Sequence, residues 1–227
     1  DAKGARATLR LLRENNPSAE MDCPETSPEA RRAGVPLEAN VVHMSLLREY
    51  GVTLVAGDRP PLQVCPVPGG GAIFRQYLLP RSAVDTDAFV SVSKLKSDAF
   101  MGVTLCLKNL FGLPPMPPLG RATAYFHHII HLPYVLVDLG RIFDPALDIV
   151  DGLVGQSGRE WSGESRIADT LIAGDQVIAT DVCAAHLMGF NPLTDWSNKP
   201  FVRDRSAMHV AHEVDYGTVD VSRIDFQ

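Results

Sequence analysis

The stretch AFVSVSKLKSDAFMGVTLCLKNLFG, from Ala88 to Gly112, decides the fold and places the candidate site. Its first residues, Ala88 to Ser93, are short, apolar and contain valine, which predicts a buried strand. A lysine-rich loop is expected directly after this strand, and Gly102 to Leu110 predicts a helix. Strands followed by helices are typical of α/β proteins, in which ligands bind beyond the carboxyl ends of the strands.

The chain on both sides of this stretch alternates helices and strands. Helices are expected at Gly4 to Glu14, Ala39 to Glu49, Ala122 to Phe143 and Gln176 to Gly189, and strands at Val52 to Ala56, Leu147 to Leu153 and Thr170 to Ala173. This order predicts an α/β fold with a mainly parallel central sheet flanked by helices. We expect one domain over residues 1–227, incomplete at the amino terminus because its first helix has no preceding cap.

Composition and charge argue against several classes of protein. Apolar residues make up 45% and charged residues 21% of the chain, as in ordinary soluble globular proteins. The net charge of −6 disfavours nucleic acid as a partner, because phosphate binding needs clustered positive charge. No apolar run approaches the ~20 residues of a transmembrane helix, and no signal-peptide pattern is present. A cytoplasmic location is favoured, unless an export signal was lost with the amino terminus.

The four cysteines, Cys23, Cys65, Cys106 and Cys183, are far apart and include no C-x-x-C pair. The usual spacing of a thiolate zinc site or an iron–sulfur cluster is therefore missing, and no such cluster is expected within this chain. Cys106 and Cys183 lie in apolar surroundings, which favours buried free thiols.

The lysines of the opening stretch are the first candidate site. Lys94 and Lys96 come directly after the predicted strand, and Lys108 and Asn109 return from the next element. Together they could surround a carboxylate or a phosphate at a strand end. The alternative is that they are ordinary solvated loop residues.

Histidines and aspartates supply further candidates. His127 and His131 share one face of a predicted helix at i,i+4, which leaves a divalent metal open, although the H-E-x-x-H pattern and a third ligand are missing. Asp151 ends a predicted strand, whereas Asp175 is placed to cap the following helix. Asp181 lies inside that helix and would be costly if buried unpaired, so we rank Asp151 and Asp181 as ligand-binding residues. Dinucleotide-binding, P-loop and hydrolase-elbow motifs are absent.

Several blocks, taken in order, resemble the family called domain of unknown function 362. They are KLK (Lys94 to Lys96), GVTLCLKNLFG (Gly102 to Gly112), IVDG (Ile149 to Gly152) and AGDQVIATDVCAAHLMGFNP (Ala173 to Pro192). The motifs lie in residues 91–112 and 147–192. The resemblance implies an α/β domain that often occurs beside ferredoxin-type iron–sulfur segments, and it implies no established general reaction.

The resemblance also implies a set of recurrent polar residues, namely Lys94, Lys96, Lys108, Asn109, Arg121, one of the histidines, Asp151, Asp175 and Asp181. This sequence departs from the family pattern in two places. Where the family often has Lys-Thr-His, this chain has Lys96-Ser97-Asp98, and the loop from Gly155 to Gly163 lacks the usual proline.

Two functions are expected from these features. The first is an enzyme or former enzyme that binds a small anionic ligand through the lysine-rich strand-end loop and Arg121, with a histidine or aspartate as the acid–base group. The second is a non-catalytic accessory or redox-partner protein that docks a ferredoxin-like iron–sulfur protein, with Leu110 to Leu119 as an apolar contact. No catalytic residue is assigned from the sequence.

Overall fold

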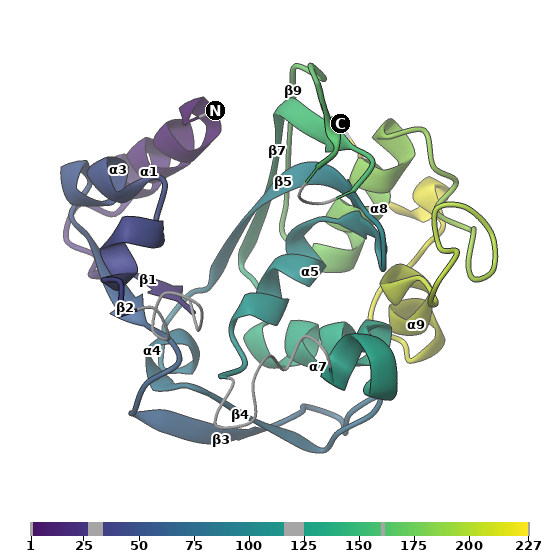
Figure 1. Ribbon diagram of the computed structural model, residues 1–227, viewed down its shortest axis with the longest axis horizontal. Coiled ribbons are helices and arrows are strands. Elements are labelled where there is room, and N and C mark those ends of the chain that lie inside the picture. Colours follow the sequence, from purple (N-terminus) through teal and green to yellow (C-terminus); the bar gives the residue numbers. More distant parts are fainter. Residues whose placement is uncertain (1, 27–33, 116–124, 160–161, 227) are drawn as a thin grey trace. The chain divides into compact units, whose positions relative to one another are not determined.

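A computed structural model describes residues 2–26, 34–115, 125–159 and 162–226, except for the side chains of residues 40, 127 and 128. The chain divides into two compact units, each built from several segments (Figure 1). Unit 1 comprises Asp1–Cys65, Tyr77–Thr86 and Gly112–Ala122, and unit 2 comprises Pro66–Gln76, Asp87–Phe111 and Thr123–Gln227. The single domain expected over residues 1–227 stays a prediction.

Unit 1 combines a two-stranded parallel sheet with short helices. β1 (Met21–Glu25) runs parallel to β2 (Val52–Ala56), which confirms the strand predicted there. α1 (Lys3–Asn15) precedes β1, and the 3-10 turn η1 (Leu37–Asn40) and α3 (Met44–Glu49) precede β2. Arg13 ties α1 to the ends of its neighbours, because Nε donates to the Tyr50 carbonyl at 3.0 Å and Nη1 to the Ala19 carbonyl at 2.8 Å.

The segment after β2 forms a pair of strands and a short helix. β3 (Leu62–Pro66) falls in a stretch rich in proline and pairs with β4 (Gln76–Pro80), which leads into the short helix α4 (Arg81–Val84). Proline at a strand end is tolerated because its missing N–H is not needed by the ladder there.

The main sheet of unit 2 is mixed. Its strands are β5 (Val90–Asp98), β6 (Gly102–Thr104), β7 (Leu147–Ser157), β8 (Glu164–Arg166) and β9 (Thr170–Gly174). The order is β6-β5-β7-β8, with β9 also paired to β7. β5 and β7 are parallel, whereas β6 pairs antiparallel with β5, and β8 and β9 pair antiparallel with β7.

The α/β class is therefore confirmed, but the expectation of a mainly parallel sheet is wrong. The reason is the length of the connections. Parallel neighbours need a crossover of about a dozen residues or more, whereas the chain turns from β5 to β6 and from β7 through β8 to β9 over shorter distances that allow only antiparallel return.

β5 is longer than predicted, and it contains both candidate lysines. Ser91, Ser93 and Leu95 are buried at every second position, so the strand alternation continues past Ser93. Lys94 and Lys96 occupy the intervening positions and are partly exposed. The predicted lysine-rich loop is thus wrong, because the two lysines are strand residues on the opposite face from Ser91 and Ser93.

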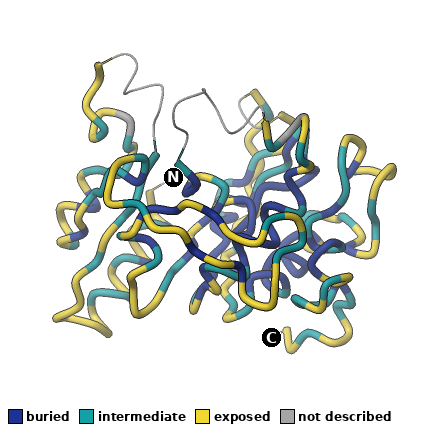
Figure 2. The backbone as a smooth tube through the Cα atoms, turned by 90° about the horizontal axis from the view of Figure 1, so that it is seen from below, coloured by how far each residue is buried: buried dark blue, intermediate teal, exposed yellow. Residues whose placement is uncertain are grey.

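Helices cover the face of the main sheet that carries Ser91 and Ser93, and we call it the helix face. α5 (Cys106–Asn109) and α8 (Val177–Leu187) pack directly on it, and α7 (Leu132–Phe143) and α9 (Ala207–Glu213) pack against these helices (Figure 1). α8 is buried along most of its length, and its buried positions include the polar Thr180 and Asp181. α7 is also largely buried, and Figure 2 shows the buried parts of the chain in dark blue.

The other side of the main sheet, which we call the open face, carries exposed apolar side chains. Val92 of β5 is 37% exposed and Leu171 of β9 is 51% exposed. Lys94 lies on this face too. It pairs with Asp151 of β7, which in turn pairs with Leu171 of β9.

The helix predicted from Ala122 to Phe143 is interrupted at His131. A π-helical turn, η3 (Phe126–Ile130), precedes His131, whose φ is 66°, and α7 starts at Leu132. Pro133 lies in the first turn of α7, where a missing N–H costs nothing, so the proline begins the helix and does not kink it. None of the helices in the described ranges is long and apolar enough to span a lipid bilayer.

Candidate functional site

Lys94 and Asp151 meet on the open face, within β5 and β7, at the point where the regular parallel pairing of the two strands ends. They lie opposite each other in the register of β5 and β7. Lys94 Nζ lies 3.0 Å from Asp151 Oδ2, and the side chains are 40% and 5% exposed, respectively. The ion pair therefore sits at the boundary between core and solvent. We call Lys94, Lys96 and Asp151 the strand-end site.

The hydrogen-bonding capacity of this ion pair is largely unused. Lys94 Nζ is itself buried, yet it makes no well-directed hydrogen bond with any described residue. An ammonium has three N–H donors, and a buried donor without an acceptor costs about 1–3 kcal/mol. On the other side of the pair, Asp151 Oδ1 accepts from the Leu153 N–H at 3.1 Å. The charges of Lys94 and Asp151 balance each other, but the Lys94 ammonium can still donate a hydrogen bond to a further acceptor.

The backbone next to the strand-end site leaves regular strand pairing. Lys94 pairs with Asp151, but Lys96 pairs with Gln156, so β7 bulges between these two points. Leu95 fills the bulge, and a Cβ at Gly155 would lie 2.7 Å from the Leu95 carbonyl oxygen. A Cβ at Gly152 would lie 2.9 Å from Leu95 Cδ2. The glycines of this segment therefore permit a close approach that any side chain would block.

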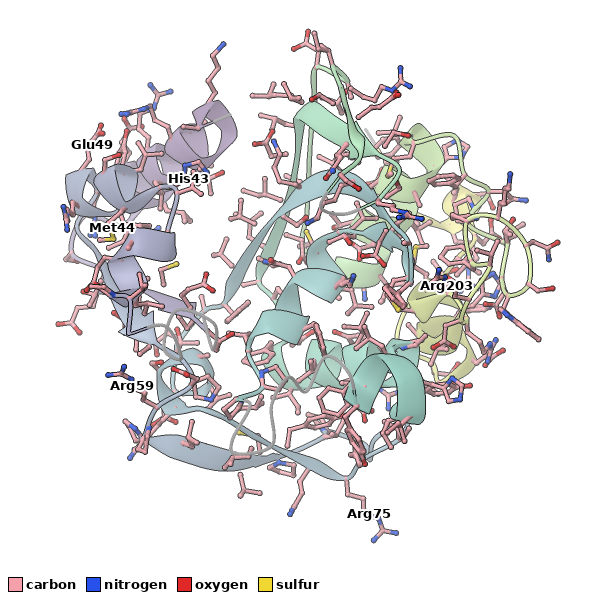
Figure 3. All side chains as sticks on the ribbon, viewed as in Figure 1. His43, Met44, Glu49, Arg59, Arg75 and Arg203 are labelled. Atoms are coloured by element: carbon pink, nitrogen blue, oxygen red, sulfur yellow. The ribbon has the colours of Figure 1, made fainter. Side chains whose placement is uncertain are left out.

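Lys108 pairs with a different carboxylate, that of Asp98. Its ammonium forms a buried ion pair with Asp98, and both side chains are less than 10% exposed. Asp98 also accepts from the N–H groups of Phe100 at 2.8 Å and Met101 at 2.6 Å. The carboxylate at the position where the family pattern often has histidine thus closes the turn from β5 to β6. Arg203, labelled in Figure 3, covers this turn, with its guanidinium carbon 4.7 Å from the centre of the Phe100 ring.

Asp181 and Asn109 hold α5 against the sheet. Asp181 is buried and accepts from the N–H groups of Cys106 at 2.8 Å and Leu107 at 3.0 Å, so it caps α5 from inside α8. Asn109 Nδ2 donates to Ser91 Oγ at 3.3 Å. These contacts explain both residues without a ligand.

Asp175 does not cap α8, contrary to the prediction. The N-cap residue is Gln176, whose side-chain oxygen accepts from the Ala179 N–H at 2.6 Å. An amide oxygen can replace a carboxylate in this role because the cap needs only an acceptor.

A buried polar cluster lies under α5, and sequence reasoning missed it. Its members are Ser91, Ser93, Cys106 and Asp148. Ser93 Oγ lies 3.3 Å from Cys106 Sγ, and the thiol donates to the Ile149 carbonyl at 3.4 Å. The Asp148 side chain is fully buried, and neither of its oxygens has a hydrogen-bond partner in good geometry among the described residues, although the Cys106 thiol lies nearby. Two serines at alternate positions of an otherwise apolar strand were the available signal for this cluster.

Burial controls the charge of this cluster. Burial and, to a smaller extent, the nearby Asp181 carboxylate raise the pKa of Asp148 to about 8, even though the Cys106 thiol opposes the rise. Burial also raises the pKa of Asp181 to about 7, although the two N–H groups that it accepts oppose the shift. The pKa of the Cys106 thiol is raised strongly by burial and by Asp181, so this cysteine is a neutral thiol rather than a nucleophile.

Of the predicted metal-binding histidines and Arg121, the structure describes only the side chain of His131. Arg121 and the side chain of His127 lie outside the described residues. His131 is exposed, and its Nδ1 lies 3.3 Å from Asp204 Oδ1. The π-helical turn and the positive φ at His131 remove the α-helical i,i+4 spacing on which the pair was based. Across the described ranges, no group of three or more His, Cys, Asp or Glu side chains could hold a metal ion. The metal at His127 and His131 stays a prediction.

Comparison with known proteins assigns the chain to a family. The model of the family described as domain of unknown function (DUF362) matches residues 6–186, which include the strand-end site, α5 and nearly all of α8. The chain belongs to this family. The family assignment inferred from the lysine, Asp-Gly and Gly-Asp blocks is thereby confirmed.

Among curated proteins, the chain is similar to a thylakoid-associated protein of Synechocystis sp.. It is 29% identical over 127 residues, which are 53% of this chain and 38% of the relative. The chain thus spans little more than a third of the length of that relative. No solved structure gives a significant match.

Proposed function

We propose that this member of the domain of unknown function 362 family binds a small anionic ligand at the strand-end site. The observation that carries the proposal is the buried Lys94 ammonium, whose N–H donors have no well-directed acceptor among the described residues. A carboxylate or phosphate oxygen placed at Lys94 would supply that acceptor through a charge-assisted hydrogen bond.

The charge and position of the strand-end site support an anion. Lys94 and Lys96 place two ammonium groups on the same face of β5, and Lys94 pairs with Asp151 across the register. The site lies where the regular parallel pairing of β5 and β7 gives way to a bulge, an irregularity of a kind that is frequent next to binding sites. Asp151 Oδ2 can in addition accept a hydrogen bond from a hydroxyl of the ligand.

The ligand contacts proposed from the structure are fewer than those expected from the sequence. Lys108, Asn109 and Asp181 serve as positioning residues, because each is engaged in a contact that holds α5 or the β5–β6 turn. An enzymatic role would use Asp151 as the acid–base group, since this carboxylate is the one paired with Lys94.

Calorimetric titration with inorganic phosphate and with citrate tests the proposal on the whole chain. Lys94→Gln and Lys96→Gln should each weaken binding of at least one of these anions by about tenfold, because each removes a charge-assisted contact. The matched control is Lys199→Gln, which removes an exposed lysine of unit 2 and should leave binding unchanged. Equal affinities in all four proteins, or no binding of either anion, would contradict the proposal.

A second candidate function is docking of a ferredoxin-like iron–sulfur protein, and the open face favours it. Val92 and Leu171 are exposed apolar side chains on the same face as the lysines, a combination suited to an acidic protein surface. Of the apolar contact expected at Leu110 to Leu119, Leu110 and Leu113 are buried, and residues 116–119 lie outside the described residues. Leu171→Asp should abolish capture of a ferredoxin and leave phosphate binding intact. Capture that survives this change would argue against docking on the open face.

A further inference from the structure

Apolar side chains on the open face of the main sheet lie directly beside Lys94. Val92 precedes Lys94 by two positions on β5 and pairs with Ile149 of β7, so both side chains lie on the same face as Lys94. Ile149 in turn pairs with Ala173 of β9. Successive side chains on one face of a strand are about 7 Å apart, so this row of apolar residues is the immediate neighbour of Lys94.

Two further positions extend this apolar surface. Val90 of β5 pairs with Leu147 of β7, and both are partly exposed. Leu171 of β9 lies across Asp151 from Lys94, and like Val92 it is exposed. We call the resulting set of residues the apolar strip, and its members are Val90, Val92, Leu147, Ile149 and Leu171.

The polar groups of the strand-end site lie at one end of the apolar strip. Lys94 forms its ion pair with Asp151 there, and Lys96 follows at the next position on the same face of β5. In the opposite direction along β5, Val92 and Val90 carry no hydrogen-bonding group in their side chains. The open face therefore presents an ammonium at one end and an apolar surface that leads away from it.

We propose that the anion bound at the strand-end site is amphipathic, a carboxylate joined to a hydrocarbon chain. This inference rests on the proposed function, because the ligand carboxylate supplies the acceptor for the buried Lys94 ammonium. The hydrocarbon chain lies over the apolar strip and removes it from water, which strengthens binding by up to about fourfold for each methylene that is buried. A wholly polar anion leaves the exposed Val92 and Leu171 in water.

Asp151 limits the charge that the ligand can carry. Its buried carboxylate lies 3.0 Å from the Lys94 ammonium, so it is also close to any anion that the ammonium binds. The repulsion between like charges scales with their product, so a doubly charged group is repelled about twice as strongly as a single carboxylate. The site therefore favours a monoanion with apolar surface over a compact polyanion.

Calorimetric titration of the whole chain with acetate, butyrate and octanoate tests the proposal, with octanol as the neutral analogue of octanoate. Octanoate should bind about tenfold more tightly than acetate, because more methylene groups leave water, and butyrate should lie between the two. Octanol should bind about tenfold more weakly than octanoate, because it lacks the charge-assisted contact. Lys94→Gln should weaken octanoate binding by a similar factor.

Substitutions in the apolar strip test the contact with the hydrocarbon chain separately from the contact with the carboxylate. Val92→Thr keeps a β-branched side chain in the strand and replaces a methyl group by a hydroxyl. This change and Leu171→Thr should each weaken octanoate binding by about threefold and leave the affinities for acetate and phosphate unchanged. Val64→Thr is the matched control, because Val64 is an exposed valine on β3 in unit 1 and lies outside the apolar strip.

Three results would overturn this proposal and leave the proposed function standing, provided that Lys94-dependent binding of phosphate or citrate is observed. They are equal affinities for acetate and octanoate, octanoate binding that Lys94→Gln does not weaken, and octanoate affinity unchanged in both the Val92 and Leu171 variants when circular dichroism shows native folding. Absence of binding by phosphate, citrate and all three carboxylates would instead contradict the proposed function, and this proposal with it.

Discussion

Lys94 and Lys108 differ in whether they stabilise the fold or remain able to bind a ligand, and the other contacts of their carboxylate partners decide which. Lys94 and Lys108 both pair with a buried carboxylate. Asp98, however, also accepts two backbone N–H groups, so its pair with Lys108 is part of a closed turn. Removing one member of such a buried pair leaves an uncompensated charge and typically costs about 3–5 kcal/mol.

Asp148 and Asp181 predict a pH dependence of stability. Their pKa values, about 8 and about 7, lie above the ordinary value of 3.8, so the folded chain holds more protons than the unfolded chain between about pH 4 and pH 8. Their stabilising contribution is complete below about pH 4 and is lost as the pH rises through the folded pKa values. Each group lowers the free energy of unfolding by up to about 1.4 kcal/mol per pH unit in this window.

Urea unfolding at several pH values between about 5 and 8 measures this slope. Asp148→Asn should make the slope shallower and raise the free energy of unfolding at the alkaline end, because an amide has no charge to desolvate. Asp87→Asn is the control, as an exposed aspartate should leave the profile unchanged. A flat profile in the unmodified chain would show that neither buried carboxyl titrates in this range.

At the scale of elements, the bulge in β7 makes Gly155 irreplaceable. An alanine Cβ at this position would lie 2.7 Å from a backbone oxygen, which cannot rotate away. Gly155→Ala should therefore lower the free energy of unfolding by about 1–3 kcal/mol, as overpacking does. Gly112→Ala is the matched control, since a Cβ there meets nothing within 4 Å, and its cost should stay within about 0.5 kcal/mol. Equal thermal midpoints of the two variants would rule out the close approach as the reason for the glycine.

Elements bounded by strong local signals were predictable, whereas their partners were not. The strand Val52 to Ala56 was placed correctly, because Gly51 ends the preceding helix with a positive φ. β5 was predicted too short, because Lys94 and Lys96 suggested a loop, whereas the alternation of buried residues continues to Leu95 and the strand to Asp98. β8, with three exposed residues, has no apolar pattern to reveal it, and it forms only because it pairs with β7.

At the scale of the whole molecule, the contacts of the candidate site residues depend on tertiary packing. The sequence predicted a lysine-rich loop after one strand and Asp151 at the end of another, whereas Lys94 and Asp151 lie within two strands that continue past them and pair with each other in register. The sequence contained no sign that Asp181 reaches the amino terminus of α5 or that Asp98 pairs with Lys108, because both contacts depend on how distant segments pack.

The segmented make-up of unit 2 predicts which fragments can fold. β5 lies between β6 and β7 in the main sheet, so a fragment of residues 125–227 lacks a central strand, and its Asp181 loses the two N–H groups of α5. A fragment of residues 66–227 keeps every segment of unit 2, including Ala72 and Phe74, whose N–H groups donate to the buried Asp138 of α7. We expect a cooperative thermal transition for the longer fragment and none for the shorter one, because buried backbone groups and an unpaired carboxylate are costly. Thermal unfolding of both fragments, followed by circular dichroism, tests this prediction. A cooperative transition in the fragment of residues 125–227 would show that β5 and α5 are dispensable for the folding of this unit.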